Sequence, residues 1–432
     1  MFLTGEFVDV YETNDYIIVF DLSSDFLKIL DYFETDKTKN IIDIRLHTKN
    51  YLALYFDYFY GLKDYHNIDS YLNVLENYEF EKAKNFNELH GELNKFINSH
   101  NDLHTSIITP GYMNSDFTPT NEGEKFDRFL TYYFDAGCYL MESEIEYTKF
   151  DDYLIIKINS FTLNTRELIQ PILKDAGNRD IIIDLSCNSG GNIISIIEVL
   201  SYLTNDNIPL SFINPITDTL ITEYYQTSKY SALDNNFFIL TSPVTYSAAN
   251  LLTSIVKDSD IGIILGFNTN GGSSSITITS LPDGAIITNS SNMTFVNDDN
   301  TIIEDGIIVD LDLYEYFTHR ELADYIDNLF INKNNVEIRE NTSDDIVSYN
   351  FKIQVNNDIF TYIEYYIDVT DTNNVLIDKK NYTHNEFAYF VDDSLFETNY
   401  KITVTVKYSL NNIITKEEVI YERIEFNNID SF

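Results

Sequence analysis

The chain has little cysteine, little positive charge and no long hydrophobic run. Its two cysteines, Cys138 and Cys187, are too few for a disulfide framework and lie in no Cys/His cluster with zinc-site spacing. Lys and Arg number 28 against 69 Asp and Glu, for a formal net charge of −41. Because such a surface repels nucleic acid and anionic membranes, we expect neither as a partner. No apolar run approaches the roughly 18 residues that a membrane-spanning helix requires.

The amino terminus also lacks the basic segment that begins a signal peptide, and it carries acids at Glu6 and Asp9. Two compartments therefore stay open: cytoplasmic, or extracytoplasmic if a signal has been removed. The acidity most simply keeps the protein soluble, and a cationic or unfolded basic substrate is the alternative explanation. A hydrophobic fraction of 44% over 432 residues is ample for two or three packed domains.

Hydrophobic periodicity divides the chain into three expected regions. Residues 1–105 mix short strands near 7–11 and 16–20, a helix near 26–33, and helices between 51 and 99, where apolar residues return every three or four positions. Residues 106–331 form an α/β core, because from Tyr153 short apolar strands alternate with helices of about ten residues. The alternation predicts βαβ units and a mainly parallel sheet.

Residues 332–432 form the third expected region. It opens with a polar stretch at 332–344 that is typical of a linker. Beyond it apolar residues alternate with period two, as at Phe351, Ile353 and Val355. Six or seven short strands in this length predict an all-β sandwich of the immunoglobulin or fibronectin type. Such a domain could bind a protein or a glycan, or act as a spacer.

Three short segments of the α/β region make chemical sense together: Asp184–Gly191, Thr245–Asn250 and Gly266–Gly272. In the second, Ser247 lies between an apolar strand and a helical run. A serine at such a junction can direct its hydroxyl outward, while the N–H of Ala248 stays free to bind an anion. A nearby glycine-rich turn could supply a second N–H, which completes an oxyanion hole. These features indicate a serine hydrolase.

With His104 upstream, these segments resemble the tail-specific or C-terminal processing peptidases, a superfamily of serine proteases that includes peptidase family S41. The resemblance covers roughly residues 60 to 315 and implies a core similar to ClpP and crotonase. The family's Asp-Leu-Arg-x-Asn-x-Gly-Gly motif matches Asp184–Gly191, with Ser186 in place of arginine. Its Gly-x-x-Thr-x-Gly motif matches Gly266–Gly271, and a Leu-Pro-Asp-Gly turn follows at Leu281–Gly284. Gly272 stands where many members carry a catalytic lysine.

The absent lysine directs the resemblance to a tricorn-like branch that uses serine, histidine and glutamate. That branch has an Asp-x-His-Thr motif, matched by Asp102–Thr105, and an acid near a segment that Gly306–Asp310 matches loosely. The resemblance thus implies Ser247 as nucleophile, His104 as general base and then acid, and Glu304 as its orienting carboxylate. Gly190 or Gly191 would form the oxyanion hole with Ala248. Neither metal nor cofactor is implied.

About 45 residues separate Thr105 from Tyr153, too few for the PDZ domain that many members carry there. We therefore expect a serine endopeptidase without a PDZ domain, acting on a protein or peptide substrate.

Other interpretations stay open. Ser247 could cap a helix, His104 could be structural with His100 as its rival, and Cys187 could be mistaken for a nucleophile. Asp299 and Asp305 compete with Glu304 for the role of orienting acid. The protein could be a binding protein with degenerate catalytic machinery, because the family's lysine and arginine are missing. An esterase is a third alternative, although the Gly-x-Ser-x-Gly elbow of common esterases is absent.

Overall fold

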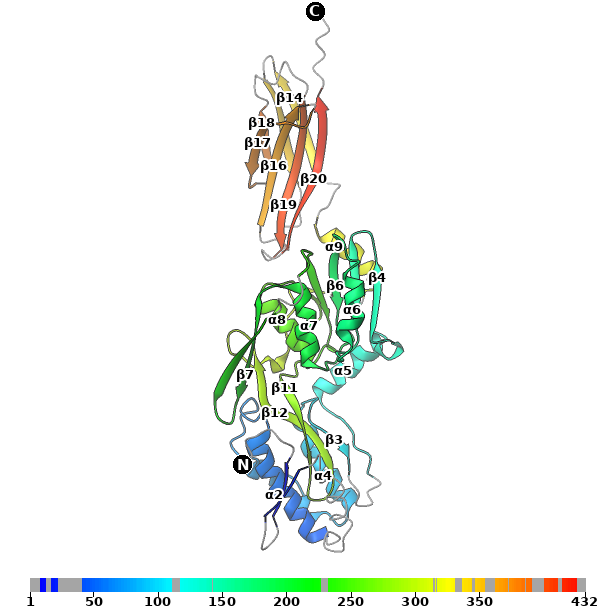
Figure 1. The fold of residues 1–432 in the computed structure, drawn as a ribbon, viewed down its shortest axis with the longest axis vertical. Coiled ribbons are helices and arrows are strands. Elements are labelled where there is room, and N and C mark those ends of the chain that lie inside the picture. The colour runs from blue at the N-terminus through cyan, green and yellow to red at the C-terminus, as the bar shows by residue number, and fades with distance from the viewer. Residues whose placement is uncertain are drawn as a thin grey trace, which may run out of the picture. The chain divides into compact units, whose positions relative to one another are not determined.

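The computed structural model separates the chain into two compact units, which are described one at a time (Figure 1). The first comprises residues 1–259 and 264–313, and the second residues 260–263 and 314–432. The structure describes residues 8–12, 17–21, 41–110, 117–141, 143–226, 232–313, 315, 317–330, 336–343, 346–353, 362–371, 373–384, 386–390, 400–410 and 414–425. The helix expected near 26–33 lies outside these residues.

The first unit begins with a hairpin and a group of helices. Strands β1 (Val8–Glu12) and β2 (Ile17–Asp21) pair antiparallel. The expected helices follow as α2 (Ile41–Phe59), α3 (Tyr71–Leu75) and α4 (Phe86–Asn98). Asn85 caps the start of helix α4, because its side chain accepts a hydrogen bond from the Glu88 N–H at 2.9 Å. The apolar face of the helix is buried at Leu89, Leu93 and Phe96. The helical amino-terminal region predicted from periodicity is therefore present.

A six-stranded mixed sheet forms the centre of the first unit, in the order β13-β10-β9-β6-β5-β4. The bounds of its strands are β4 (Ile145–Lys149), β5 (Tyr153–Ile158), β6 (Asp180–Asp184), β9 (Phe237–Thr241), β10 (Ile263–Gly266) and β13 (Leu311–Asp312). β5, β6 and β9 run parallel, and β4 joins antiparallel at one edge. All five residues of β6 are buried, which is typical of a strand covered on both faces.

Helices connect the parallel strands, as the alternating pattern predicted. The connecting helices are α6 (Thr165–Leu173), α7 (Ile193–Leu203) and α8 (Ala248–Asp258), whereas α5 (Glu124–Asp135) comes before β4 in the chain. Figure 1 shows α6, α7 and α8 lying side by side, and α7 contacts both of the others. The carboxyl ends of β6 and β9 thus lead directly into the turns that precede α7 and α8, where ligand sites of open α/β sheets form.

A second sheet, in the order β11-β12-β7-β8, connects this centre to the amino-terminal helices. Its strands are β7 (Asn207–Asn214), β8 (Thr219–Gln226), β11 (Ser274–Ser280) and β12 (Ile286–Val296). β11 and β12 form a hairpin through the turn expected at Leu281–Gly284. β12 also pairs with β3 (Ser106–Thr109), where Ser106 lies opposite Thr288. This pairing anchors the segment that carries His104 to the protease-like region.

In its described residues, the second unit holds α9 (His319–Phe330) and seven strands in two sheets, one ordered β14-β15-β18 and the other β17-β16-β19-β20. The strands are β14 (Val336–Ser343), β15 (Ile346–Ile353), β16 (Tyr362–Asp371), β17 (Leu376–Tyr382), β18 (Glu386–Phe390), β19 (Tyr400–Leu410) and β20 (Ile414–Glu425). The stretch 332–344, expected as a linker, contains β14. Strand β14 pairs with β15 over its whole length, and this ladder outweighs its polar composition.

Candidate active site

Ser247 occupies a strained turn between β9 and α8. Its backbone angles are φ 55° and ψ −123°, a conformation that non-glycine residues adopt at a cost and that clusters at functional sites. The side chain makes no capping hydrogen bond to α8, so Ser247 does not use its hydroxyl as a helix cap. The turn is held instead by the backbone, because the Ser247 N–H donates to the Gly271 carbonyl at 2.9 Å. The hydroxyl therefore remains available to a ligand.

Two glycine turns press against this serine. A Cβ placed on Gly190 would come within 2.7 Å of the Ser247 Cβ, and φ there is +112°. A Cβ on Gly272 would lie 2.6 Å from Cζ of Tyr246 and 2.8 Å from the Ser247 nitrogen. Only glycine permits either approach without displacing the serine turn. The position where many relatives carry lysine has no room for any side chain in this chain.

The candidate oxyanion donors differ in availability. The Gly190 N–H already donates to Asn188 Oδ1 at 2.8 Å. Gly191 lies opposite Phe161 in an isolated β-bridge, but the two hydrogen bonds of this bridge are made by the neighbours of Gly191. The Phe161 N–H donates to the Gly190 carbonyl, and the Asn192 N–H donates to the Phe161 carbonyl. The bridge therefore leaves the N–H of Gly191 unused. Gly191, rather than Gly190, is the glycine that can serve with Ala248 at the start of α8.

His104 lies in the segment between α4 and β3, and it is 4% exposed. Its Nδ1 lies 3.5 Å from Ser290 Oγ on β12. Its Nε2 is buried and has no hydrogen-bond partner among the residues that the structure describes. Burial lowers the pKa of His104 below that of a free imidazole, and this outweighs the charges of Asp102 and Glu304, which raise it. The ring is therefore neutral near pH 7, as a general base must be.

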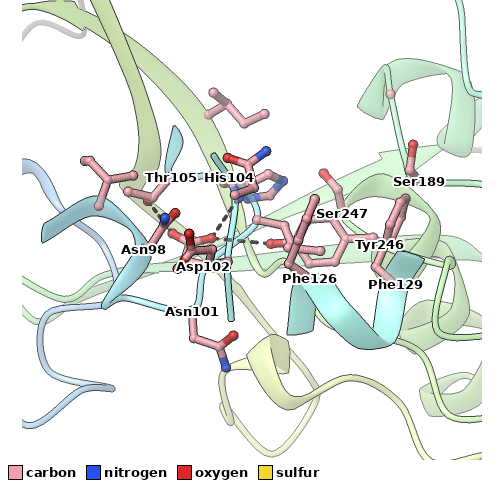
Figure 2. A pocket seen from close by; sticks show the side chains of 16 residues that line it. Asn98, Asn101, Asp102, His104, Thr105, Phe126, Phe129, Ser189, Tyr246 and Ser247 are labelled. Atoms are coloured by element: carbon pink, nitrogen blue, oxygen red, sulfur yellow. Dashed lines mark hydrogen bonds between the residues drawn. The ribbon is translucent and has the colours of Figure 1, made fainter. Parts of the chain in front are cut away.

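Ser247 and His104 line one cavity of about 370 Å³. Figure 2 shows Phe126 and Phe129 of α5 near Ser247, together with the approach of the Tyr246 hydroxyl to Asp102. The Tyr246 ring contacts the His104 ring edge to face, with centroids 4.8 Å apart. The lining also includes Ile97, Asn98, Asn101, Asp102, Leu103, Thr105, Asn121, Glu122, Ser189, Gly191 and Ile276. The fold thus brings together the predicted nucleophile and the predicted base from distant parts of the sequence.

Glu304 lies close to this pair but has other partners. It is 1% exposed and accepts hydrogen bonds from the N–H and the hydroxyl of Ser273, at 2.8 and 2.9 Å. Its second carboxylate oxygen forms an ion pair with Lys125, which also donates to the Glu304 carbonyl at 2.8 Å. No hydrogen bond between Glu304 and the His104 ring occurs among the described residues. The orienting contact expected from the sequence is therefore missing in this conformation.

Asp102 is the second buried carboxylate near His104. Its oxygens accept the His104 N–H at 2.9 Å and the Thr105 hydroxyl at 2.6 Å. The Tyr60 and Tyr246 hydroxyls approach it at 3.3 and 3.4 Å. Burial opposes its ionisation, but the charge that His104 carries when it is protonated, together with the hydrogen bonds from Thr105 and His104, prevails and lowers the pKa of Asp102. A buried aspartate ion therefore lies beneath the imidazole.

The rival residues have structural partners. His100 donates from Nδ1 to the Phe96 carbonyl at 2.9 Å, and its Nε2 accepts the Tyr71 hydroxyl at 3.1 Å. Cys187 is joined to Cys138 in a disulfide, so it is no thiol nucleophile. The sequence analysis expected no disulfide framework, and this single bridge joins residues 49 apart in the chain. Asp305 accepts a hydrogen bond from the Tyr65 hydroxyl, well placed to hold a loop.

In the described part of the chain, no group of three or more His, Cys, Asp or Glu side chains is arranged to hold a metal ion. No helix within the described ranges is long and apolar enough to cross a bilayer.

The comparisons with known proteins agree with the geometry. The sequence model of peptidase family S41 matches residues 152–313, which include the Ser247 turn and all three glycine-bearing segments. Residues 152–313 are therefore similar to peptidase family S41. The match ends at the last residue of the first compact unit. No curated protein matches the chain.

Solved structures show the same fold around this S41 segment. A candidate peptidase from Parabacteroides merdae ATCC 43184 superposes with a TM-score of 0.53 at 17% identity, over 65% of this chain and 92% of that one. At such identity the likeness establishes the fold. Mature CPAF, with a TM-score of 0.49 and 12% identity, aligns over 66% of this chain and 96% of its own.

The sequence analysis missed two members of the site. Lys125 lies in α5, and no sequence motif marks it as the partner of Glu304. Ser290 lies on β12 in a polar strand where several serines are equivalent by sequence. Asp102 carried a signal, because it belongs to the same motif as His104, but it was not assigned a role.

Proposed function

We propose that this protein is a serine endopeptidase that hydrolyses peptide bonds through an acyl-enzyme on Ser247. One observation carries the proposal. A strained serine with an uncommitted hydroxyl shares a cavity with a buried, neutral histidine whose Nε2 has no partner among the described residues. The strained serine backbone and the unpartnered histidine nitrogen each cost free energy, and neither is needed to pack the core. A Ser–His pair that awaits substrate accounts for both.

In the proposed reaction, Nε2 of His104 accepts the Ser247 proton while Oγ attacks the substrate carbonyl carbon. The N–H groups of Gly191 and Ala248 hold the oxyanion that forms. When the tetrahedral intermediate collapses, His104 delivers the proton to the departing amine. Water then attacks the acyl-enzyme by the same sequence, with His104 again acting as the base.

The sequence assigned the third position of the triad to Glu304. Its carboxylate is supported as part of the buried set, because its charge raises the pKa of His104. Because both oxygens are engaged by Lys125 and Ser273, the Glu304 carboxylate acts on His104 through its charge and not through a hydrogen bond. The core of the proposal is therefore the Ser247–His104 pair.

The second unit has a separate proposed role. We infer that its strands form a sandwich of the immunoglobulin or fibronectin type, supported by two antiparallel sheets and by the alternating burial of β19. The binding of a protein or a glycan by this unit stays a prediction. Of the two compartments left open by the sequence, the Cys138–Cys187 disulfide supports the extracytoplasmic one.

The test is proteolysis of an unfolded protein such as reduced casein, together with labelling by a fluorophosphonate, for the wild type, Ser247→Ala and His104→Ala. We expect cleavage and labelling by the wild type, neither by Ser247→Ala, and a severe loss in His104→Ala. Cleavage that survives Ser247→Ala would identify another nucleophile. No cleavage and no labelling by the wild type would favour a binding protein with degenerate machinery. Hydrolysis of a nitrophenyl ester without cleavage of any peptide would indicate an esterase.

A further inference from the structure

We propose that Asp102, rather than Glu304, is the carboxylate that positions His104 and stabilises its protonated form during the reaction. The inference rests on the proposed Ser247–His104 chemistry and names the residue that supports it. It assigns to Asp102 the role that the sequence gave to Glu304.

Asp102 is bound to the backbone of the residue it serves. The carboxylate accepts the His104 N–H at 2.9 Å, and it accepts the Thr105 hydroxyl at 2.6 Å. These two bonds close a tight turn, and the turn fixes the direction in which the His104 side chain leaves the backbone. The ring then has little freedom, because Tyr246 contacts it edge to face and Ser290 lies beside Nδ1. Removal of the carboxylate would release the turn that aims the imidazole at the cavity.

The charge of Asp102 is buried without a cation. Asp102 is 6% exposed, and none of the ion pairs among the described residues includes it. Neutral hydroxyls surround it, because burial, reinforced by nearby carboxylate charge, raises the pKa of Tyr60 and of Tyr246. A buried ion with only neutral partners costs free energy, and such a charge is typical of a functional site. The missing counter-ion appears when His104 becomes protonated.

Glu304 lacks this property. Lys125 neutralises its carboxylate, and Ser273 satisfies the remaining oxygen with two hydrogen bonds. Seen from His104, the charges of Glu304 and Lys125 oppose each other, because the first raises the pKa of the imidazole and the second lowers it. Lys125 therefore offsets part of the effect that the Glu304 charge has on the imidazole. Asp102 contributes the uncompensated negative charge.

Other titratable groups around the two residues leave this balance unchanged. His66 lies 3.2 Å from the Tyr60 hydroxyl, and burial lowers the pKa of His66. Burial also lowers the pKa of His100 to about 4. Tyr71 stays neutral, because burial and the charge of Asp102 raise its pKa. Near pH 7 the cation whose charge acts on the imidazole is therefore Lys125, which is already paired with Glu304.

The proton transfer balances without a change in Asp102. The Ser247 O–H bond breaks as the bond from Oγ to the carbonyl carbon forms, and the proton moves to Nε2 of His104. The proton on Nδ1 stays there and points towards Ser290 Oγ. With protons on both nitrogens, the ring carries one positive charge. Asp102 stays ionised and lowers the free energy of this imidazolium. When the amine leaves, the proton departs with it and the ring becomes neutral again.

The test is the pH dependence of inactivation by a fluorophosphonate, which reports on Ser247 and His104 without knowledge of the peptide substrate. Inactivation slows as His104 becomes protonated, which gives an acid limb. In Asp102→Asn we expect this limb to move to lower pH by about 1 pH unit. The plateau rate should fall about tenfold, since one pH unit corresponds to a factor of ten in imidazolium stabilisation.

Two matched variants serve as controls. Asp57→Asn removes another carboxylate of the amino-terminal region, one that binds Ser70 and the Tyr71 N–H and is neutralised by Lys63. The double variant Lys125→Met/Glu304→Gln removes two opposing charges at once. We expect the acid limb to stay in place in both. A limb that shifts as much in the double variant as in Asp102→Asn would overturn the proposal.

A gentler variant keeps the proposal testable if Asp102→Asn fails to fold. Tyr60→Phe keeps the charge of Asp102 but removes one of its donors, so its attraction for the imidazolium strengthens and the limb should rise slightly. An unchanged limb in Tyr60→Phe, or in a folded Asp102→Asn, contradicts the inference. If wild type does not react at all, the proposed function fails, and NMR titration of His104 in wild type and Asp102→Asn still decides. Equal pKa values for His104 in the two proteins would refute the role of Asp102.

Discussion

His100 and His104 are four residues apart and equally buried, yet their surroundings differ in one decisive respect. Both ring nitrogens of His100 are hydrogen-bonded within the aromatic cluster of the amino-terminal helices, where Phe56, Tyr71 and Phe96 contact its ring. His104 has one weak partner at Nδ1 and an unpartnered Nε2 at the cavity. Burial alone therefore does not mark a functional histidine. An unsatisfied nitrogen that faces a cavity shared with a strained serine does.

The largest effect expected from this comparison is on activity. His104→Ala should lower kcat/KM by at least about 1,000-fold, because the serine loses its base. The melting temperature should change little, since Nε2 makes no bond that the variant would lose. The matched variant His100→Ala should do the reverse, with activity retained and stability lowered by about 2 kcal/mol, because the buried Tyr71 hydroxyl loses its acceptor. Peptidase assays and calorimetry on both proteins check this, and loss of activity in both alike would remove the distinction.

The second prediction concerns the opposite wall of the cavity. The Cys138–Cys187 disulfide ties the end of α5, which carries Phe126 and Phe129, to the turn that carries Gly191. For the 49-residue separation, loop-closure entropy predicts a loss of about 4 kcal/mol on removal of the bridge. Denaturant unfolding of Cys138→Ala/Cys187→Ala against the oxidised protein measures it. Equal stability with and without a reducing agent would contradict the prediction.

The third prediction concerns His100 and the way in which the free energy of unfolding depends on pH. Burial lowers the pKa of His100 to about 4, below its unfolded value of about 6.5. The unfolded chain then binds a proton more readily, so this contribution is complete above pH 6.5 and declines as the pH falls towards 4. By pH 5 the loss should be about 2 kcal/mol. The free energy of unfolding should be measured at pH 7 and pH 5, and His100→Gln should lack this part of the decline.

The smallest effect is on the acid limb of activity. Because burial lowers the pKa of His104, the base stays neutral below the pH at which a free imidazole takes up a proton. Activity should therefore be retained at pH 6.5 and decline only in more acidic solution. A kcat/KM profile on a peptide substrate measures this limb. A midpoint clearly above pH 6.5 would mean that the carboxylates outweigh burial.

The α/β region was predictable in detail because its pattern is strong. The alternation of strands and helices expected from Tyr153 onward is present in β6 and α7, since continuous apolar runs separated by glycine turns leave few alternatives. The hairpin of β7 and β8 was not foreseen, because its exposed residues, such as Tyr224, weaken the hydrophobic signal. β14 was taken for a linker because its stability comes from pairing with β15, which composition does not reveal.

The candidate site divides in the same way. Ser247, His104 and Ala248 could be named from motifs, because those motifs reflect local backbone chemistry. The choice of Gly191 over Gly190 depends on a hydrogen bond that the Gly190 N–H donates to the Asn188 side chain, which only folded coordinates show. The engagement of Glu304 by Lys125 joins residues 179 apart in the chain, and no local pattern encodes such a pair.

By itself, the sequence determined the S41 segment, its glycine turns and the identity of the candidate serine and histidine, because each depends on the conformation of a few consecutive residues. Only the tertiary structure decided which histidine has an unused nitrogen, that two distant cysteines meet, and which of two buried carboxylates keeps its charge uncompensated. These properties depend on what surrounds a side chain after folding. They arise from contacts between residues far apart in sequence, and the sequence order does not specify those contacts locally.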